Sequence, residues 1–183
     1  MKKQLVVVGL LLCGLVFVAA IAPDDSPRVA QVVALDECDP VTFNGPTGVG
    51  PDFCKNIALG FSTQFSTLLA EAATPNPDPK WDFEPDTLKV KQGTVLSVVD
   101  QGGEPHTFTE VKQFGGGFIG PLNGGQPAAP ECAAGFDGTP AGIAVAKTRI
   151  LQGSTSLVTG LSKGKHYFQC CIHPWMHFTV EVQ

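Results

Sequence analysis

The sequence has few of the residues on which several large protein classes depend. Among 183 residues, 12 are lysine or arginine against 17 acidic ones, with one tyrosine and two tryptophans. A net charge of −5 argues against a nucleic-acid binder, which needs a basic face. The 21 glycines and 15 prolines follow no three-residue period, which excludes collagen. A hydrophobic content of 43% excludes a disordered chain, and the length suits one domain with an appendage.

Motifs of the common nucleotide-binding and hydrolytic enzymes are also missing. Residues 115–120 formally match a dinucleotide fingerprint, but Pro121 follows and no strand–helix–strand unit surrounds them. There is no phosphate loop, no two-histidine zinc-protease helix and no cysteine pair with a two-residue gap. Glu104 and His106 with a distant serine would suggest a hydrolase, yet nothing resembles a nucleophile elbow. We therefore expect neither a dinucleotide-binding enzyme nor a hydrolase of this kind.

Residues 1–22 have the pattern of a secretory signal peptide. Lys2 and Lys3 precede an apolar run from Leu5 to Ala22 that ends in small residues. The run has 18 residues, so an uncleaved anchor is the alternative. Either interpretation places the rest of the chain outside the cytoplasmic membrane, in the periplasm or secreted. We expect no stable membrane insertion once the signal is removed.

Five cysteines follow the signal, at positions 38, 54, 132, 170 and 171. Disulfides persist in the oxidising compartment that export implies. An odd number of cysteines leaves one thiol for another role. If that thiol binds a metal, the other four can form two bridges, for which three pairings exist.

Charge divides the chain at a proline-spaced linker. Residues 23–79 hold two basic and eight acidic residues, a net charge of −6, and end in the linker 74–79. Residues 80–183 hold eight basic and nine acidic residues, a net charge of −1. Within the first part only residues 61–73 have a helical pattern. We therefore predict an acidic extension with a short helix over 23–79, packed on a main domain over 80–183.

The main domain has the pattern of an all-β fold. Short β-prone runs bounded by Gly, Pro, Asn or Ser cover residues 88–91, 95–99, 107–111, 144–151, 154–158, 166–171 and 178–182. Several recur at the 8–12-residue spacing of a β-sandwich or barrel. Residues 114–142 interrupt that rhythm with a Gly- and Pro-rich stretch that carries Cys132, and we predict a long loop there.

The most informative residues lie near the C-terminus. A strand that runs into a tight loop would bring Cys170, His173 and Met176 to one point, and His106 from another strand end could complete the set. A thiolate, two imidazoles and a distant thioether are the ligands of an electron-transfer copper site. The thiolate binds both oxidation states strongly, and the weak thioether contact lets one geometry serve both. Little rearrangement then opposes electron transfer.

Two segments, residues 164–176 and Pro105-His106, resemble the ligand loops of the blue copper proteins, or cupredoxins, of the plastocyanin and amicyanin group. The resemblance covers residues 80–183 and implies a cupredoxin-like Greek-key β-sandwich or barrel. It also implies one type 1 copper ion with the ligands His106, Cys170, His173 and Met176. Thr107 stands where many relatives have Asn, which predicts a weaker tie between the two ligand loops.

Strand alternation separates the two adjacent cysteines. Residues 166, 168 and 170 share one face of the strand, and residues 167, 169 and 171 share the other. If Phe168 packs inward, Cys170 points toward the metal and Cys171 points away. The pairing that we favour among the three possible ones is then Cys132–Cys171 with Cys38–Cys54.

The resemblance implies a monomeric electron carrier, not an enzyme, that cycles between Cu(II) and Cu(I). Redox proteins would dock transiently on an apolar patch formed by His173, Pro174 and Trp175. The acidic extension would either steer basic partners or keep the protein soluble.

The alternatives are a copper storage or delivery protein, and a catalytic copper protein resembling nitrosocyanin, in which His177 or a carboxylate replaces Met176. A structural zinc site is a further alternative, formed by Cys170, Cys171, His173 and His177.

Overall fold

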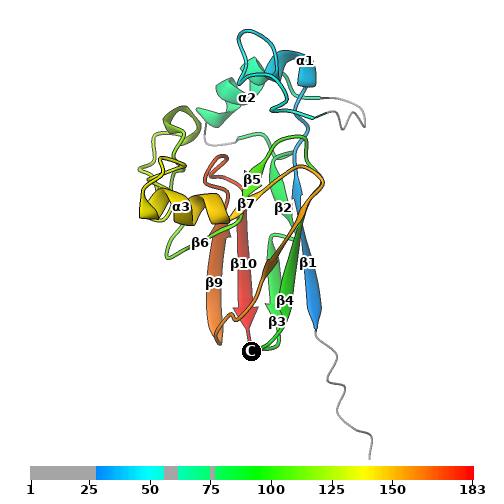
Figure 1. Ribbon diagram of the computed structural model, residues 1–183, viewed down its shortest axis with the longest axis vertical. Helices are drawn as coiled ribbons and strands as arrows, with labels where there is room; N and C mark the ends of the chain where they lie inside the picture. Colours follow the sequence, from blue (N-terminus) through cyan, green and yellow to red (C-terminus); the bar gives the residue numbers. More distant parts are fainter. Residues whose placement is uncertain (1–27, 56–61, 75–76) are drawn as a thin grey trace, which may run out of the picture.

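The structure is a computed structural model that describes residues 28–55, 62–74 and 77–183 (Figure 1). The expected signal peptide, residues 1–22, lies outside the described residues. Within the described part, no helix is long and apolar enough to cross a membrane.

Two mixed four-stranded sheets form a β-sandwich (Figure 1). The first sheet has the order β2 (Asp82–Glu84), β1 (Val29–Leu35), β4 (Val95–Asp100), β8 (Thr155–Val158). The second has the order β3 (Thr87–Val90), β10 (His177–Val182), β9 (Gly164–Gln169), β6 (Thr109–Val111). A short pair, β5 (His106–Thr107) with β7 (Arg149–Ile150), lies at one end. The repeated crossing between sheets is consistent with a Greek key, so the all-β sandwich is confirmed; the described strands form no closed barrel.

Strand β1 belongs to the sandwich, although the predicted division at residue 80 placed it in the extension. It pairs in parallel with β4, from Val29 opposite Val95 to Ala34 opposite Asp100, and antiparallel with β2. The side chains of Val32 and Ala34 are fully buried, because alternate residues of β1 face the core. Charge and the proline-spaced linker marked residues 23–79 as separate, but the buried alternate residues of β1 belong to the core of the sandwich.

The remainder of the extension lies over the end of the sandwich and is called the cap here, residues 36–55 and 62–74. It contains α1 (Pro40–Phe43) and α2 (Phe65–Ala72), which confirms a short helix where one was expected. Asp39 caps α1 by accepting from the backbone N–H groups of Val41 and Thr42. The disulfide Cys38–Cys54 closes the cap.

Aromatic side chains from both sheets fill the space between them. Phe108 stacks on Phe168 with ring centroids 4.4 Å apart and meets Phe83 edge-to-face at 5.1 Å. Phe178 and Val180 of β10 are fully buried beside them. Burial of each such side chain contributes about 1.5–3 kcal/mol. The core therefore anchors the strand ends that carry the candidate ligands.

The long insertion after β6 differs in part from its prediction. Residues 144–147, expected to be strand, belong to α3 (Pro140–Lys147), and only β7 is extended. Thr139 caps α3 by accepting from the N–H of Gly142, and Pro140 suits the first turn. The disulfide Cys132–Cys171 ties the insertion to the end of β9, so both expected pairings are confirmed. A 3-10 helix, η1 (Gly120–Leu122), completes the elements.

Candidate metal centre

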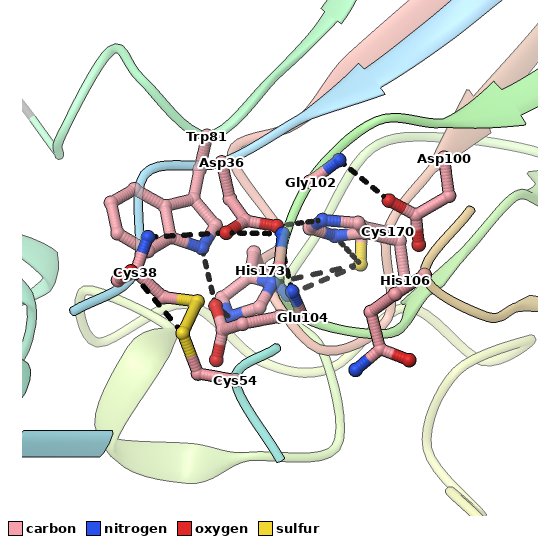
Figure 2. A network of polar contacts seen from close by, with 12 residues as sticks. Asp36, Cys38, Cys54, Trp81, Asp100, Gly102, Glu104, His106, Cys170 and His173 are labelled. Atoms are coloured by element: carbon pink, nitrogen blue, oxygen red, sulfur yellow. Dashed lines mark hydrogen bonds and ion pairs between the residues drawn. A yellow bond between two sulfur atoms is a disulfide. The ribbon is translucent and has the colours of Figure 1, made fainter. Parts of the chain in front are cut away.

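Three donor atoms from two distant segments meet at the capped end of the sandwich (Figure 2). The Sγ of Cys170 lies 3.8 Å from Nδ1 of His106 and 4.0 Å from Nδ1 of His173. All three side chains are buried, and their donor atoms lie within 4.8 Å of one another. His106 begins β5, whereas Cys170 and His173 lie in the loop between β9 and β10.

Backbone hydrogen bonds hold the loop between β9 and β10 in a tight turn. The N–H of Cys170 donates to the carbonyl of Met176 at 3.1 Å, and the N–H of Met176 donates to the carbonyl of His173 at 3.0 Å. The N–H groups of His173 and Thr107 each lie 3.4 Å from Sγ of Cys170 and donate to it. Donors directed at sulfur stabilise a thiolate there.

Thr107 joins the two ligand loops. Its hydroxyl accepts from the N–H of Cys171 at 2.7 Å, so the tie that the sequence predicted to be weaker is present through a threonine. Cys171 is disulfide-bonded to Cys132, and Cys170 is a free, buried cysteine. The alternative of a zinc site that includes Cys171 is therefore wrong.

The remaining candidate ligands differ in their surroundings. Met176 is fully buried in the same loop as Cys170 and His173, and its role as the axial ligand stays a prediction. His177 stacks on Phe114 with centroids 3.9 Å apart and is absent from the clusters of donor atoms found among the described residues. The partly buried His166 pairs with the exposed Glu110 at 2.7 Å.

The pKa of each of the three donors is shifted in the direction that favours its charged form. Burial alone would raise the pKa of Cys170, but the imidazoles of His106 and His173 outweigh it and hold that pKa well below its ordinary value. Burial alone would lower the pKa of each histidine. For His106, Asp36 and the thiolate raise the pKa well above its ordinary value, and for His173, Glu104 and the thiolate raise it to about 9. Metal binding at the two Nδ1 atoms must therefore release protons.

A buried carboxylate contacts the outer nitrogen of each imidazole (Figure 2). Nε2 of His106 lies 2.9 Å from Oδ2 of Asp36, and Nε2 of His173 lies 3.2 Å from Oε2 of Glu104. When Nε2 is the protonated nitrogen, it donates to the carboxylate and leaves Nδ1 facing sulfur. Sequence reasoning missed both residues: Asp36 follows β1 in the presumed extension, and Glu104 was considered only for a hydrolase.

Asp36 is fully engaged as an acceptor. Besides His106, it accepts from the backbone N–H groups of Cys38, Gly103 and Glu104. These bonds outweigh the effect of burial and keep the pKa of Asp36 below its ordinary value. Gly102 makes the approach possible, because a Cβ at that position would collide with the Asp36 carboxylate.

A third carboxylate lies beside this network. Asp100 ends β4; its Oδ1 accepts from the N–H of Gly102 at 2.8 Å, and its buried Oδ2 has no partner among the described residues. Burial raises its pKa to about 7. Asp36, Asp100 and His106 bring their polar atoms within 4.8 Å of one another, but Asp36 already uses its acceptor positions. Asp36 and Asp100 therefore form a polar network that supports His106.

Trp81 and Glu104 cover the side of His173 that was expected to be open. Nε1 of Trp81 donates to Oε2 of Glu104 at 2.6 Å, and the Trp81 ring lies 6.1 Å from that of His173. His173 is only 1% exposed, Pro174 is buried and Trp175 is half-buried. The predicted docking patch of His173, Pro174 and Trp175 is not confirmed: the imidazole of His173 is shielded because Trp81 and Glu104 lie against it.

The donor set fits a trigonal metal site. Zinc forms bonds of about 2.3 Å to a thiolate sulfur and about 2.0 Å to an imidazole nitrogen. With such bonds, a sulfur–nitrogen separation of about 3.8 Å corresponds to a sulfur–metal–nitrogen angle of about 120°. The observed separations of 3.8 and 4.0 Å agree with that value. One thiolate with two imidazoles and a weak axial thioether is the set that electron-transfer copper sites use.

Comparisons with known proteins give distant structural similarities. No family model and no curated protein matches the sequence. An amicyanin variant in its reduced state is 18% identical, with 56% of this chain and 73% of that chain covered and a TM-score of 0.34. A purple cupredoxin from Nitrosopumilus maritimus is 12% identical, with 84% and 99% covered and a TM-score of 0.41. The functional conclusion therefore rests on the residues of the site.

Proposed function

We propose that this protein is an exported type 1 copper protein that carries single electrons between redox partners. The observation that carries the proposal is the buried convergence of one free thiolate and two Nδ1 atoms at separations of 3.8 and 4.0 Å. When bound, copper supplies the Cu(II)/Cu(I) couple. His106, Cys170 and His173 would hold the ion, with Met176 as the axial ligand.

The residues around these donors favour fast electron exchange. The N–H groups of Thr107 and His173 donate to Sγ of Cys170, and carboxylates hold the outer nitrogens of both imidazoles. Because these contacts fix the sulfur and the two imidazoles before copper binds, the ligands need to move little when copper changes its oxidation state. Burial of the three donors keeps water from the site.

The partners are redox proteins that bind transiently. His173 is covered, so a partner would approach over the cap or beside the half-buried Trp175 and would not touch the imidazole. The acidic residues of the region before Lys80 favour a basic partner at low salt. In this proposal the carrier is a monomer and lies in the periplasm or is secreted. Amino-terminal sequencing of the exported chain tests removal of residues 1–22.

The decisive experiment is the optical and EPR spectrum of the copper-loaded protein. We expect an intense thiolate-to-copper absorption that gives a blue colour, and its loss in Cys170→Ser. His166→Gln removes a partly buried histidine outside the donor cluster and serves as the matched control for His106→Gln. A band that survives Cys170→Ser would overturn the ligand assignment. A colourless copper form would favour storage or delivery, and a red form would favour an open, nitrosocyanin-like site.

A further inference from the structure

Glu104 bridges Trp81 and the candidate ligand His173. Its Oε2 accepts from Nε1 of Trp81 at 2.6 Å and lies 3.2 Å from Nε2 of His173. Glu104 and His173 are each 1% exposed, as is Trp81. Figure 2 shows the carboxylate between the indole and the imidazole. This contact fixes the orientation of the His173 ring from the side opposite to Cys170.

The Glu104 carboxylate acts on His173 through its negative charge as well as through its position. The partners that the structure gives to the Glu104 side chain are N–H groups of Trp81 and His173, and neither is a permanent cation. With a metal on Nδ1, His173 keeps its proton on Nε2, and the hydrogen bond to a carboxylate makes the imidazole a stronger donor. In a buried site, a negative charge this close stabilises a divalent ion more than a monovalent one.

We propose that Glu104 is a positioning residue that acts on the metal through His173 and biases the site toward the oxidised, divalent ion. Trp81 sets how strongly it does so, because its N–H shares the same carboxylate oxygen. This inference rests on the proposed copper site and adds to it a determinant of the reduction potential. Asp36 contacts His106 in the same way, but its four N–H donors already spread its charge.

The test compares Glu104→Gln with wild type in the copper-loaded full chain. Gln keeps the size of the side chain and removes its charge. We expect a higher reduction potential and a Cu(II) affinity lowered about 10–100-fold, with a smaller loss of Cu(I) affinity. Both affinities are measured by competition with chelators. Glu110→Gln is the matched control, because Glu110 contacts His166 at 2.7 Å on the surface, away from the site.

A second variant keeps the inference testable if Glu104→Gln does not fold. Trp81→Phe retains the carboxylate and removes the N–H that shares its charge, so the reduction potential should fall. Unchanged potentials and unchanged Cu(II)/Cu(I) affinity ratios in the variants that fold would overturn the role of Glu104. If the wild type instead lacks the thiolate-to-copper absorption, the proposed function fails. The two failures are therefore distinct.

Discussion

The sulfur of Cys170 lies 3.8 Å from Nδ1 of His106, although 64 positions separate the two residues in the chain. Thr107 links the segments that carry them. Its N–H donates to that sulfur, and its hydroxyl accepts from the N–H of Cys171. One residue therefore sets both the position of the second loop and part of the environment of the thiolate.

Thr107→Ala should destabilise the protein and loosen the site. The substitution leaves the buried N–H of Cys171 without its acceptor, which costs about 1–3 kcal/mol. Denaturant unfolding of the metal-free protein measures this loss. Thr107→Ser keeps the hydroxyl and should retain most of the stability. An equal loss in both variants would show that the methyl group, not the hydrogen bond, is responsible.

Asp36→Asn should cost more, because Asp36 accepts four N–H groups inside the protein. An amide has one acceptor oxygen, and its NH2 group would face donors on the other side. We expect a loss of about 2–4 kcal/mol in the free energy of unfolding, together with weaker metal binding through His106. Asp86→Asn changes an exposed carboxylate and provides the control. A loss as small as that of the control would contradict the network seen around Asp36.

The sequence predicted the candidate donors better than their surroundings. Alternation along β9 separated Cys170 from Cys171, and the structure confirms that division through the disulfide to Cys132. Local spacing determines which face of a strand a side chain occupies, so it is readable from sequence. The strands from 87 to 182 were found largely for the same reason, apart from residues 144–147, where capping by Thr139 favours a helix.

The parts that could not be predicted depend on contacts between distant segments. Asp36 reaches His106 across 70 positions only because β1 pairs in parallel with β4. Trp81 and His173 lie far apart in the chain but contact the same carboxylate oxygen of Glu104. Neither contact has a spacing signature, and the acidic composition before residue 80 pointed away from a shared sheet.

The two disulfides should differ in their effect on stability. Cys132–Cys171 spans 39 positions and Cys38–Cys54 spans 16. The loop-entropy relation gives about 4 kcal/mol for the longer loop and about 3 kcal/mol for the shorter one. Urea unfolding of Cys132→Ser/Cys171→Ser and of Cys38→Ser/Cys54→Ser measures both losses. A larger loss for the shorter loop would mean that packing of the cap, not chain entropy, dominates.

The metal-free protein should lose stability as the pH rises from about 6.5 to about 9. The pKa of His173 rises from its ordinary 6.5 to about 9 because Glu104 and the thiolate outweigh burial. Its stabilisation is therefore complete below 6.5 and is lost as the pH rises through 9. His106, whose pKa is also raised, acts in the same direction.

Cys170 opposes this trend, because a lowered pKa gives stability that is present at high pH and lost as the pH falls. Two histidines against one thiolate leave a net decline in the free energy of unfolding as the pH rises over this window. Urea unfolding of the metal-free protein at several pH values measures the slope. His173→Gln removes the contribution of one histidine and should make the decline with pH shallower. A slope that His173→Gln leaves unchanged would mean that the folded, metal-free protein does not hold His173 as an imidazolium.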